Sequence, residues 1–574
     1  MQLHFRTRLI AAIAVIIFFA SCSKTNKQGR MVPKEAGFVM HINGKSLSGK
    51  VNMEELKQMD FYKQLNEEMM ADSNQSELMK RLNTYNTNSG IDSLSDFIFF
   101  VDNSNPAASH LVLEAGLKDA KAFESFLKNV YPEGSISKDG DVQVMGIKNK
   151  VVITWNNEKI IAGFRGPANR FGDNYPEVVT TEDVNNIPEL ASYCKKMYAL
   201  KEDSSMAKDE KFTDLVNTDG DLHAWINTEK LMGNLPQMGM LSMMKMDKFL
   251  TGNISTLTLN FDNGKIAIKS KGYAGKELSD VLKKYSGGSI NTDMLKNIPS
   301  QDVVGVLALH FKPEGLKELV KLSGMDGFAD ILLAQQGISL DDFFKANKGD
   351  VMFAVSDLTM KKDSVHFPGV NGKTESFATE TPDAKFIFSA AINNKDAFNK
   401  LINYAKKESG DGMGLDKISY NTNKEYFAIG NSPDYVSKFL AGGKADLPFL
   451  SKISGNPVGG YVDLQKVMKV FATESNKDSI SKKIMDESLK TWESVTLTGG
   501  DYSGGGLNQL LEVNMVDKGT NSLKQLFKYG LTMASLEKER EKSYNTPIVD
   551  EVKVKPEVKK DNKPVIAHPK VKRK

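Results

Sequence analysis

The sequence predicts an α+β protein made of two related modules, each a mainly antiparallel sheet with helices packed on one face. Three observations support this prediction: segments recur in one order along the chain, strands alternate apolar and polar residues around turns, and helical periodicity follows capping residues. The proposed divisions are a signal peptide at 1–21, a tether at 22–32, modules at 33–290 and 291–542, and a disordered basic tail at 543–574.

The start of the chain is typical of an exported lipoprotein. Two arginines precede an apolar run over residues 9–20, which is shorter than the roughly 20 residues that a membrane span requires. Small residues at 20 and 21 suit a signal peptidase, and Cys22 then offers a thiol for lipid attachment. We therefore predict cleavage before Cys22 and acylation (diacylglycerol and a palmitate-type chain) at this residue. Several acyl chains hold a protein firmly, whereas one holds it only marginally.

Repetition of five segments in the same order indicates an internal duplication. The five pairs are 40–47 with 309–316, 90–101 with 337–355, 114–130 with 389–405, 223–232 with 459–468, and 254–285 with 493–529. A duplicated module explains five matches in one order better than chance does.

The recurring unit is predicted to be a strand, a polar cap and an amphipathic helix. Residues 222–226 are apolar, and Asn227 after them is suited to accept a backbone N–H of the first helical turn. Asp463 takes the same place in the second module. In a second unit, the strand at 386–388 leads to Asn393 and then to apolar residues at helical spacing. Residues 53–83 form a longer, charged helical stretch, predicted as a lid or a pair of helices.

Hairpins are predicted where alternating strands flank turn residues. Residues 257–271 alternate around Asn263 and Gly264, which both tolerate the positive φ angles of a type I′ turn. The glycine run at 504–506 predicts a loose turn between two strands rather than a phosphate-binding loop. Such hairpins favour antiparallel sheet with one packed face and one face open to water or to a partner.

Charge and cysteine content narrow the function classes. The chain has a net charge of +3, but residues 550–574 alone hold nine basic and four acidic residues, so the body is mildly acidic. We predict no nucleic-acid binding by the body. The tail is predicted to contact anionic envelope surfaces or only to keep the chain end soluble. Cys194 is the only cysteine after Cys22, which leaves no disulfide within the body once Cys22 is acylated.

No catalytic, metal or cofactor motif is found in the sequence. The segment 372–374 imitates the end of a P-loop, but Phe367 stands where that motif needs glycine. His41 and His310 occupy matched positions in the two modules and alternate away from the apolar stripe of their strands. They could form a metal or acid–base site across a two-fold axis, but the lack of ligands at metal-binding spacing favours structural or surface histidines.

Methionines are concentrated at residues 232–246. Thioethers bind Cu(I), they suit a surface that accepts varied apolar partners, and they also fill cores. Glycine and proline interrupt a regular helix here, and the corresponding place in the second module is polar. We therefore predict an apolar contact surface that consists of Met238, Met240, Met243, Met244 and Met246.

The lipid-attachment pattern, the tether, the segment VPKEAGFVMHINGKSL at 32–47 and the duplicated body resemble a Bacteroidota envelope lipoprotein family catalogued as domain of unknown function 4836. The resemblance covers nearly the whole mature chain. It implies an envelope lipoprotein and carries no established activity or catalytic residues.

The resemblance also implies a location. In lipoproteins of the Bacteroidota type, acidic residues just after the cysteine signal export to the cell surface, and residues 23–27 contain none. We therefore predict a lipid-anchored protein of the outer membrane that faces the periplasm. The body is predicted to act without catalysis, as a binding or structural module for an apolar ligand or an envelope protein partner. The alternative is a hydrolase that modifies envelope glycans or lipids through dispersed carboxylates. A broad apolar groove favours binding, and a deep cleft with paired carboxylates favours the enzyme.

Overall fold

The computed structural model describes residues 28–51, 76–85, 89–104, 109–148, 150–166, 185–232, 247–335, 337–368, 374–408, 418–475 and 478–545, with a few single positions between them. The predicted signal peptide, Cys22, the five methionines of the predicted contact surface and the tail from residue 546 lie outside the described residues.

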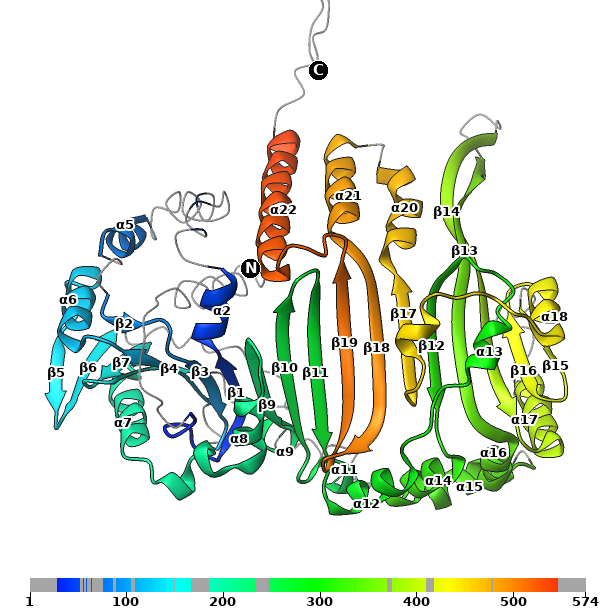
Figure 1. Ribbon diagram of the computed structural model, residues 1–574, viewed down its shortest axis with the longest axis horizontal. Helices are drawn as coiled ribbons and strands as arrows, with labels where there is room; N and C mark the ends of the chain where they lie inside the picture. Colours follow the sequence, from blue (N-terminus) through cyan, green and yellow to red (C-terminus); the bar gives the residue numbers. More distant parts are fainter. Residues whose placement is uncertain are drawn as a thin grey trace, which may run out of the picture.

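One continuous antiparallel sheet runs the length of the molecule (Figure 1). From one end to the other the neighbouring strands are β5 (Ile136–Asp139), β6 (Val142–Ile147), β7 (Val151–Trp155), β8 (Lys159–Arg165), β4 (His110–Leu117), β3 (Phe97–Asp102), β1 (Ala36–Ile42), β9 (Leu222–Asn227), β10 (Ile254–Asp262), β11 (Lys265–Tyr273), β19 (Gly506–Met515), β18 (Trp492–Ser503), β17 (Val458–Asp463), β12 (Val303–His310), β13 (Asn347–Pro368), β14 (Thr374–Ile392), β16 (Tyr426–Gly430) and β15 (Ser419–Thr422). The short β2 (Ile91–Asp92) pairs with β4.

The order of strands is the same in the two halves of the sheet. The first half runs β8-β4-β3-β1-β9-β10-β11, and the second runs β16-β14-β13-β12-β17-β18-β19. The halves meet where β11 pairs with β19, with Ile268 opposite Leu511. Two copies of one module related by a two-fold axis would give this arrangement, although the duplication itself remains a prediction from the sequence.

Helices cover one face of both halves, which we call the covered face. α7 (Ile187–Tyr198) and α8 (Glu210–Asn217) pack on the first half, and α13 (Thr292–Lys296), α18 (Pro433–Ala441) and α19 (Leu450–Ile453) pack on the second. The buried cores beneath them include Trp225 and Phe212 in one half and Ile387 and Phe439 in the other. Towards the ends of the sheet, α6 (Ala120–Val130) and α17 (Lys395–Glu408) also cover the opposite face.

The remaining helices lie mostly along the margins of the sheet (Figure 1). They are α2 (Gly44–Lys50), α5 (Ser76–Tyr85), η2 (Glu202–Ser204), η3 (Met206–Lys208), α9 (Thr228–Met232), α11 (Asp247–Leu250), α12 (Lys276–Tyr285), α14 (Pro313–Leu322), α15 (Asp326–Ala334), α16 (Leu340–Ala346), α20 (Leu464–Ser475), α21 (Ser479–Thr491) and α22 (Ser522–Asn545). In the described part of the chain, no helix combines the length and the apolar character needed to cross a membrane.

Capping residues start the helices much as the sequence predicts. The Asn227 side chain accepts the backbone N–H of Lys230 at 3.0 Å, and Asp463 accepts that of Lys466 at 2.9 Å. In the other unit, Asn394 rather than Asn393 caps the helix, because its side chain accepts the N–H of Ala397 at 2.9 Å. The Asn393 side chain instead donates to a backbone carbonyl of α16.

The hairpin at 254–273 forms as predicted, but the predicted type I′ turn is wrong. Only Gly264 has a positive φ, +68°, because Asn263 forms a β-bridge with Asn521 and is held in another conformation. The two positive φ angles that a type I′ turn requires occur instead at Gly504 and Gly505, with φ +55° and +80°. The glycine run is therefore a tight turn between β18 and β19.

The predicted tether is shorter than expected, because residues 28–32 are folded. Val32 has no exposed surface, and its carbonyl accepts the backbone N–H of Met206 at 2.8 Å. Gly29 accepts the N–H of Ala207 at 3.2 Å. Apolar Met31 and Val32 pack into the first core, which outweighs the polar composition of the residues before them. At the other end, α22 continues to Asn545, past the predicted start of the tail at residue 543.

Candidate functional site

The uncovered face of the sheet carries large apolar side chains. In β13, Met352 and Ala354 are each 1% exposed, whereas Phe353 between them is 44% exposed. Leu307 in β12 is 43% exposed and Phe388 in β14 is 36% exposed, again between buried neighbours. Since successive residues of a strand point to opposite faces, these three side chains share the face opposite the main helical cores.

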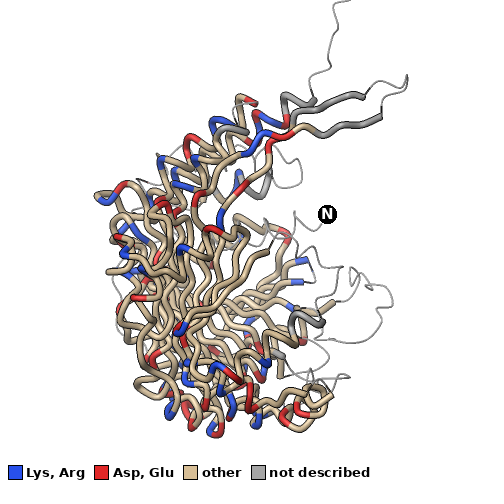
Figure 2. Tube along the Cα trace, turned by 90° about the vertical axis from the view of Figure 1, so that its right-hand side faces the viewer, with Lys and Arg blue, Asp and Glu red and all other residues tan. Residues whose placement is uncertain are grey.

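Strand register joins these side chains into one row across both halves. In order, the row consists of Phe388, Phe353, Leu307, Gly460, Leu497, Leu511, Ile268, Leu259 and Leu222. We call the surface built on this row the apolar face. In Figure 2, the strands are mostly tan, and the charged residues concentrate on helices and loops around them.

Polar residues are buried on the covered face. Ser356 and Ser389 have no exposed surface, and Glu114 is 3% exposed. Lys159 holds Glu114 through an ion pair of 2.6 Å, and Ser389 donates to the carbonyl of Phe427 at 2.8 Å. Contiguous exposed apolar surface on a soluble body marks a site of interaction. The apolar face is therefore a candidate binding surface.

A second apolar surface lies on α15. Phe328, Ile331 and Leu332 are 56%, 65% and 49% exposed, and their spacing of i, i+3 and i+4 places them on one side of the helix. This helix was not predicted from the sequence, although its largely apolar composition is a signal that could have indicated it. Close to the start of α15, Lys245 donates its backbone N–H to the carbonyl of Ser323 at 3.0 Å.

The two singled-out histidines lie in separate clusters. His41 contacts His223 and Asp96, whereas Nδ1 of His310 lies 2.8 Å from Asp350. We predicted that the histidines point away from the apolar stripe of their strands, and they do. Helices pack on the side of the strand where His41 lies, so His41 is buried at 1% exposure, as the structural alternative of the prediction requires. His310 is partly exposed, with 24% of its side chain open to solvent.

The described residues contain neither a clear metal-binding group nor a reactive thiol. Within them, no group of three or more His, Cys, Asp or Glu side chains is arranged to hold a metal ion. Burial raises the pKa of the Cys194 thiol to about 12. The thiol is therefore protonated at neutral pH, and it is a poor nucleophile.

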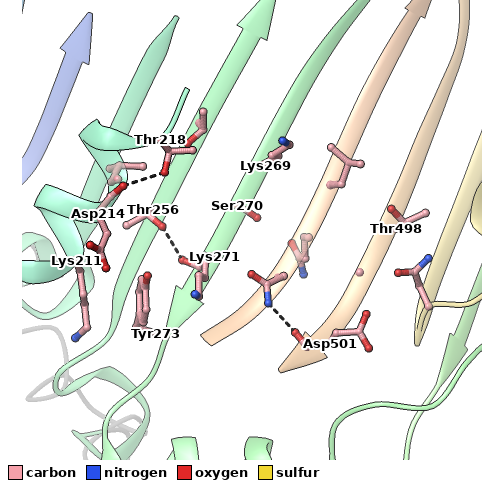
Figure 3. Close-up of a pocket in the computed structure, with 17 residues that line it drawn as sticks. Lys211, Asp214, Thr218, Thr256, Lys269, Ser270, Lys271, Tyr273, Thr498 and Asp501 are labelled. Atoms are coloured by element: carbon pink, nitrogen blue, oxygen red, sulfur yellow. Dashed lines mark hydrogen bonds between the residues drawn. The ribbon is translucent and has the colours of Figure 1, made fainter. Parts of the chain in front are cut away.

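A polar cavity of about 480 Å³ lies on the covered face where the two halves meet (Figure 3). Its floor is formed by β10, β11, β19 and β18, and α8 forms one side. We call it the seam groove. Its polar lining includes Lys211, Asp214, Thr218, Thr256, Thr258, Lys269, Lys271, Tyr273, Thr498, Asp501 and Asn508. Sequence reasoning missed this site, because its residues come together only through the pairing of β11 with β19.

Comparisons with known proteins place the chain in a family. A family model described as Domain of unknown function (DUF4836) matches residues 29–430. No curated protein matches the chain. Among solved structures, crystal forms I and III of TP0453 are each 8% identical to this chain with a TM-score of 0.23. The matched region covers 44% and 45% of this chain, and 81% and 82% of the TP0453 chains. A similarity this weak supports no statement about this chain.

Proposed function

This chain belongs to the family described as Domain of unknown function (DUF4836), and we propose that it is a membrane-anchored envelope lipoprotein that binds lipid acyl chains on its apolar face without catalysis. The observation that carries the proposal is the apolar row across the sheet, in which Leu307, Phe353 and Phe388 are exposed. The row continues into the first half through side chains that are partly buried.

The apolar face suits acyl chains better than peptides. Leu307 pairs with Phe353 on one side and with Gly460 on the other, so the backbone of β12 has no free edge for an added strand. The side chains of the row offer no hydrogen bonds to a peptide backbone. An acyl chain needs none, and each methylene removed from water contributes about 0.8 kcal/mol.

The predicted lipid at Cys22 would keep this face close to a bilayer that supplies such ligands. The exposed stripe of α15 supports the same proposal, since a helix side rich in Phe, Ile and Leu favours the membrane interface. The aliphatic and aromatic side chains of the apolar face have no groups that can transfer protons. This favours binding over the hydrolase alternative.

Binding of cis-parinaric acid, a fluorescent fatty acid, tests the proposal on the mature chain with Cys22→Ala. We expect saturable binding that weakens at least tenfold when Leu307 and Phe353 are both changed to Glu. Val516→Glu is the matched control, because Val516 is a 45% exposed apolar residue outside the row. Equal binding by the double variant and the control, or no binding by the parent protein, contradicts the proposal.

Cell fractionation tests the anchor separately. The chain with native Cys22 is expected in the membrane fraction, and Cys22→Ala in the soluble fraction. Membrane association of the variant at the parental level would rule out lipid anchoring at this residue.

A further inference from the structure

The seam groove lies on the face opposite to the apolar face and is independent of acyl-chain binding. Lys269 and Lys271 project from β11, and Lys211 comes from α8 (Figure 3). On the other side, β18 contributes Thr498 and Asp501. The groove is therefore lined by residues of both halves of the sheet, and it exists only because β11 pairs with β19.

Three lysines in the groove have no acidic partner. Lys265, on the same strand outside the groove, forms an ion pair of 2.5 Å with Glu512. Across the described residues, no carboxylate comes within 4.0 Å of the ammonium groups of Lys211, Lys269 or Lys271. Lys211 and Lys271 instead each lie 5.2 Å from the ring centre of Tyr273. Their charges remain available to an anion.

The groove also contains acceptors. Asp214 lies one helical turn from Lys211 on α8, and Asp501 lies across the groove on β18. These carboxylates would repel a bare phosphate or a fatty acid carboxylate, but they can accept hydrogen bonds from hydroxyl groups. Thr498 adds a hydroxyl of its own. The combination suits a ligand that has both negative charges and hydroxyl groups.

We propose that the seam groove binds an anionic saccharide, with Lys211, Lys269 and Lys271 at its acidic groups and Asp214 and Asp501 at its hydroxyls. The cavity volume of about 480 Å³ falls within the range of roughly 300–1,000 Å³ that is usual for ligand sites. Because Lys269 is exposed and Lys211 and Lys271 are partly exposed, such binding should be sensitive to salt.

Calorimetry on the mature chain with Cys22→Ala tests this proposal with three probes. Tetragalacturonate carries sugar rings with carboxylates, maltotetraose carries neutral sugar rings, and inorganic phosphate carries charge alone. We expect tetragalacturonate to bind at least tenfold more tightly than either comparison probe in 50 mM salt, and more weakly in 300 mM salt.

The double variant K269Q/K271Q should weaken tetragalacturonate binding at least tenfold without changing the melting temperature or cis-parinaric acid binding. Its matched control is K276Q/K283Q, which changes two exposed lysines on α12 outside the groove. Unchanged binding by K269Q/K271Q, equal binding of maltotetraose or phosphate, or no binding of tetragalacturonate overturns the proposal.

Discussion

The Nδ1 atoms of His41 and His223 lie 3.0 Å apart across β1 and β9, and both side chains are 1% exposed. Nε2 of His223 lies 3.0 Å from the carbonyl of Thr218, to which it can only donate. In neutral His223, Nδ1 is then the acceptor, so His41 donates from Nδ1. Nε2 of His41 lies 3.3 Å from Asp96. His41 therefore donates to His223, and His223 donates to the carbonyl of Thr218, a residue that lines the seam groove.

The pKa shifts fit this arrangement. Burial and then the charge of His41 lower the pKa of His223 to about 4. At Asp96, burial acts to raise the pKa, but the hydrogen bond and charge of His41, together with Gln28 and Lys159, lower it below its ordinary value. The contacts of His41 with His223 and with Asp96 therefore act on the two pKa values in the observed directions.

Stability should fall in acid through His223. Its folded pKa of about 4 lies below the unfolded value of roughly 6.5, so its contribution is complete above pH 6.5 and is lost as the pH falls towards 4. The shift corresponds to a loss of about 3 kcal/mol. Urea unfolding at pH 7 and pH 4 should show a larger loss for the parent protein than for His223→Gln. His310→Gln is the control, and an equal loss in all three proteins would contradict the assignment.

Asp221 should be a strong determinant of stability. It has no exposed surface and accepts hydrogen bonds from Ser46 at 2.7 Å, Lys50 at 2.5 Å and the backbone N–H of Phe261 at 2.6 Å. Asp221→Ala leaves these donors unpaired, and we expect the free energy of unfolding to fall by about 3–5 kcal/mol. Chemical denaturation measures the change. The exposed Asp219→Ala is the control, and a loss below about 1 kcal/mol for Asp221→Ala would refute the prediction.

Gly264→Ala should destabilise the central hairpin. The residue has a φ of +68°, and a Cβ built there would lie 2.6 Å from the Cα of Lys518. We expect a loss of about 1–3 kcal/mol in denaturant unfolding. Gly272→Ala, in the following strand β11 and with no atom within 4 Å of its Cβ position, should change stability by less than about 0.5 kcal/mol. Equal effects of the two substitutions would show that the turn is not constrained.

The α15 stripe should contribute to membrane contact. Phe328→Ser with Ile331→Ser removes two of its most exposed apolar side chains. Flotation of the Cys22→Ala chain with phosphatidylcholine vesicles should decrease at least tenfold, because each apolar side chain buried in lipid contributes about 1.5–3 kcal/mol. The melting temperature should not change. Val516→Ser serves as the control, and flotation that matches the parent protein would exclude α15 from the contact.

Methionine oxidation tests the predicted contact surface. Dilute peroxide followed by mass spectrometry should modify Met238, Met240, Met243, Met244 and Met246 faster than Met352 and Met515, which are 1% and 0% exposed. Exposed thioethers react with solvent oxidants, whereas packed ones are protected. Oxidation of the cluster at the same slow rate as Met352 would assign these methionines to a core.

Local structure was predictable from the sequence because it depends on neighbouring residues. The strand, cap and helix around Asn227 and Asp463 require only a side-chain oxygen at the first helical turn. Likewise, alternation around Gly264 was enough to predict a hairpin. The turn type was not predictable, since Asn263 pairs with Asn521, more than 250 residues away in the sequence.

By itself the sequence determined the α+β class, the antiparallel hairpins and the order of recurring units, because periodicity and capping act within a few residues. Only the tertiary structure decided which side of each strand is covered. The alternation of Phe353 with Met352 has the same pattern whichever side is buried, and helices from distant segments made Met352 the core residue. The seam groove was also decided at this level, because Lys269 and Asn508 share one site only through the pairing of β11 with β19.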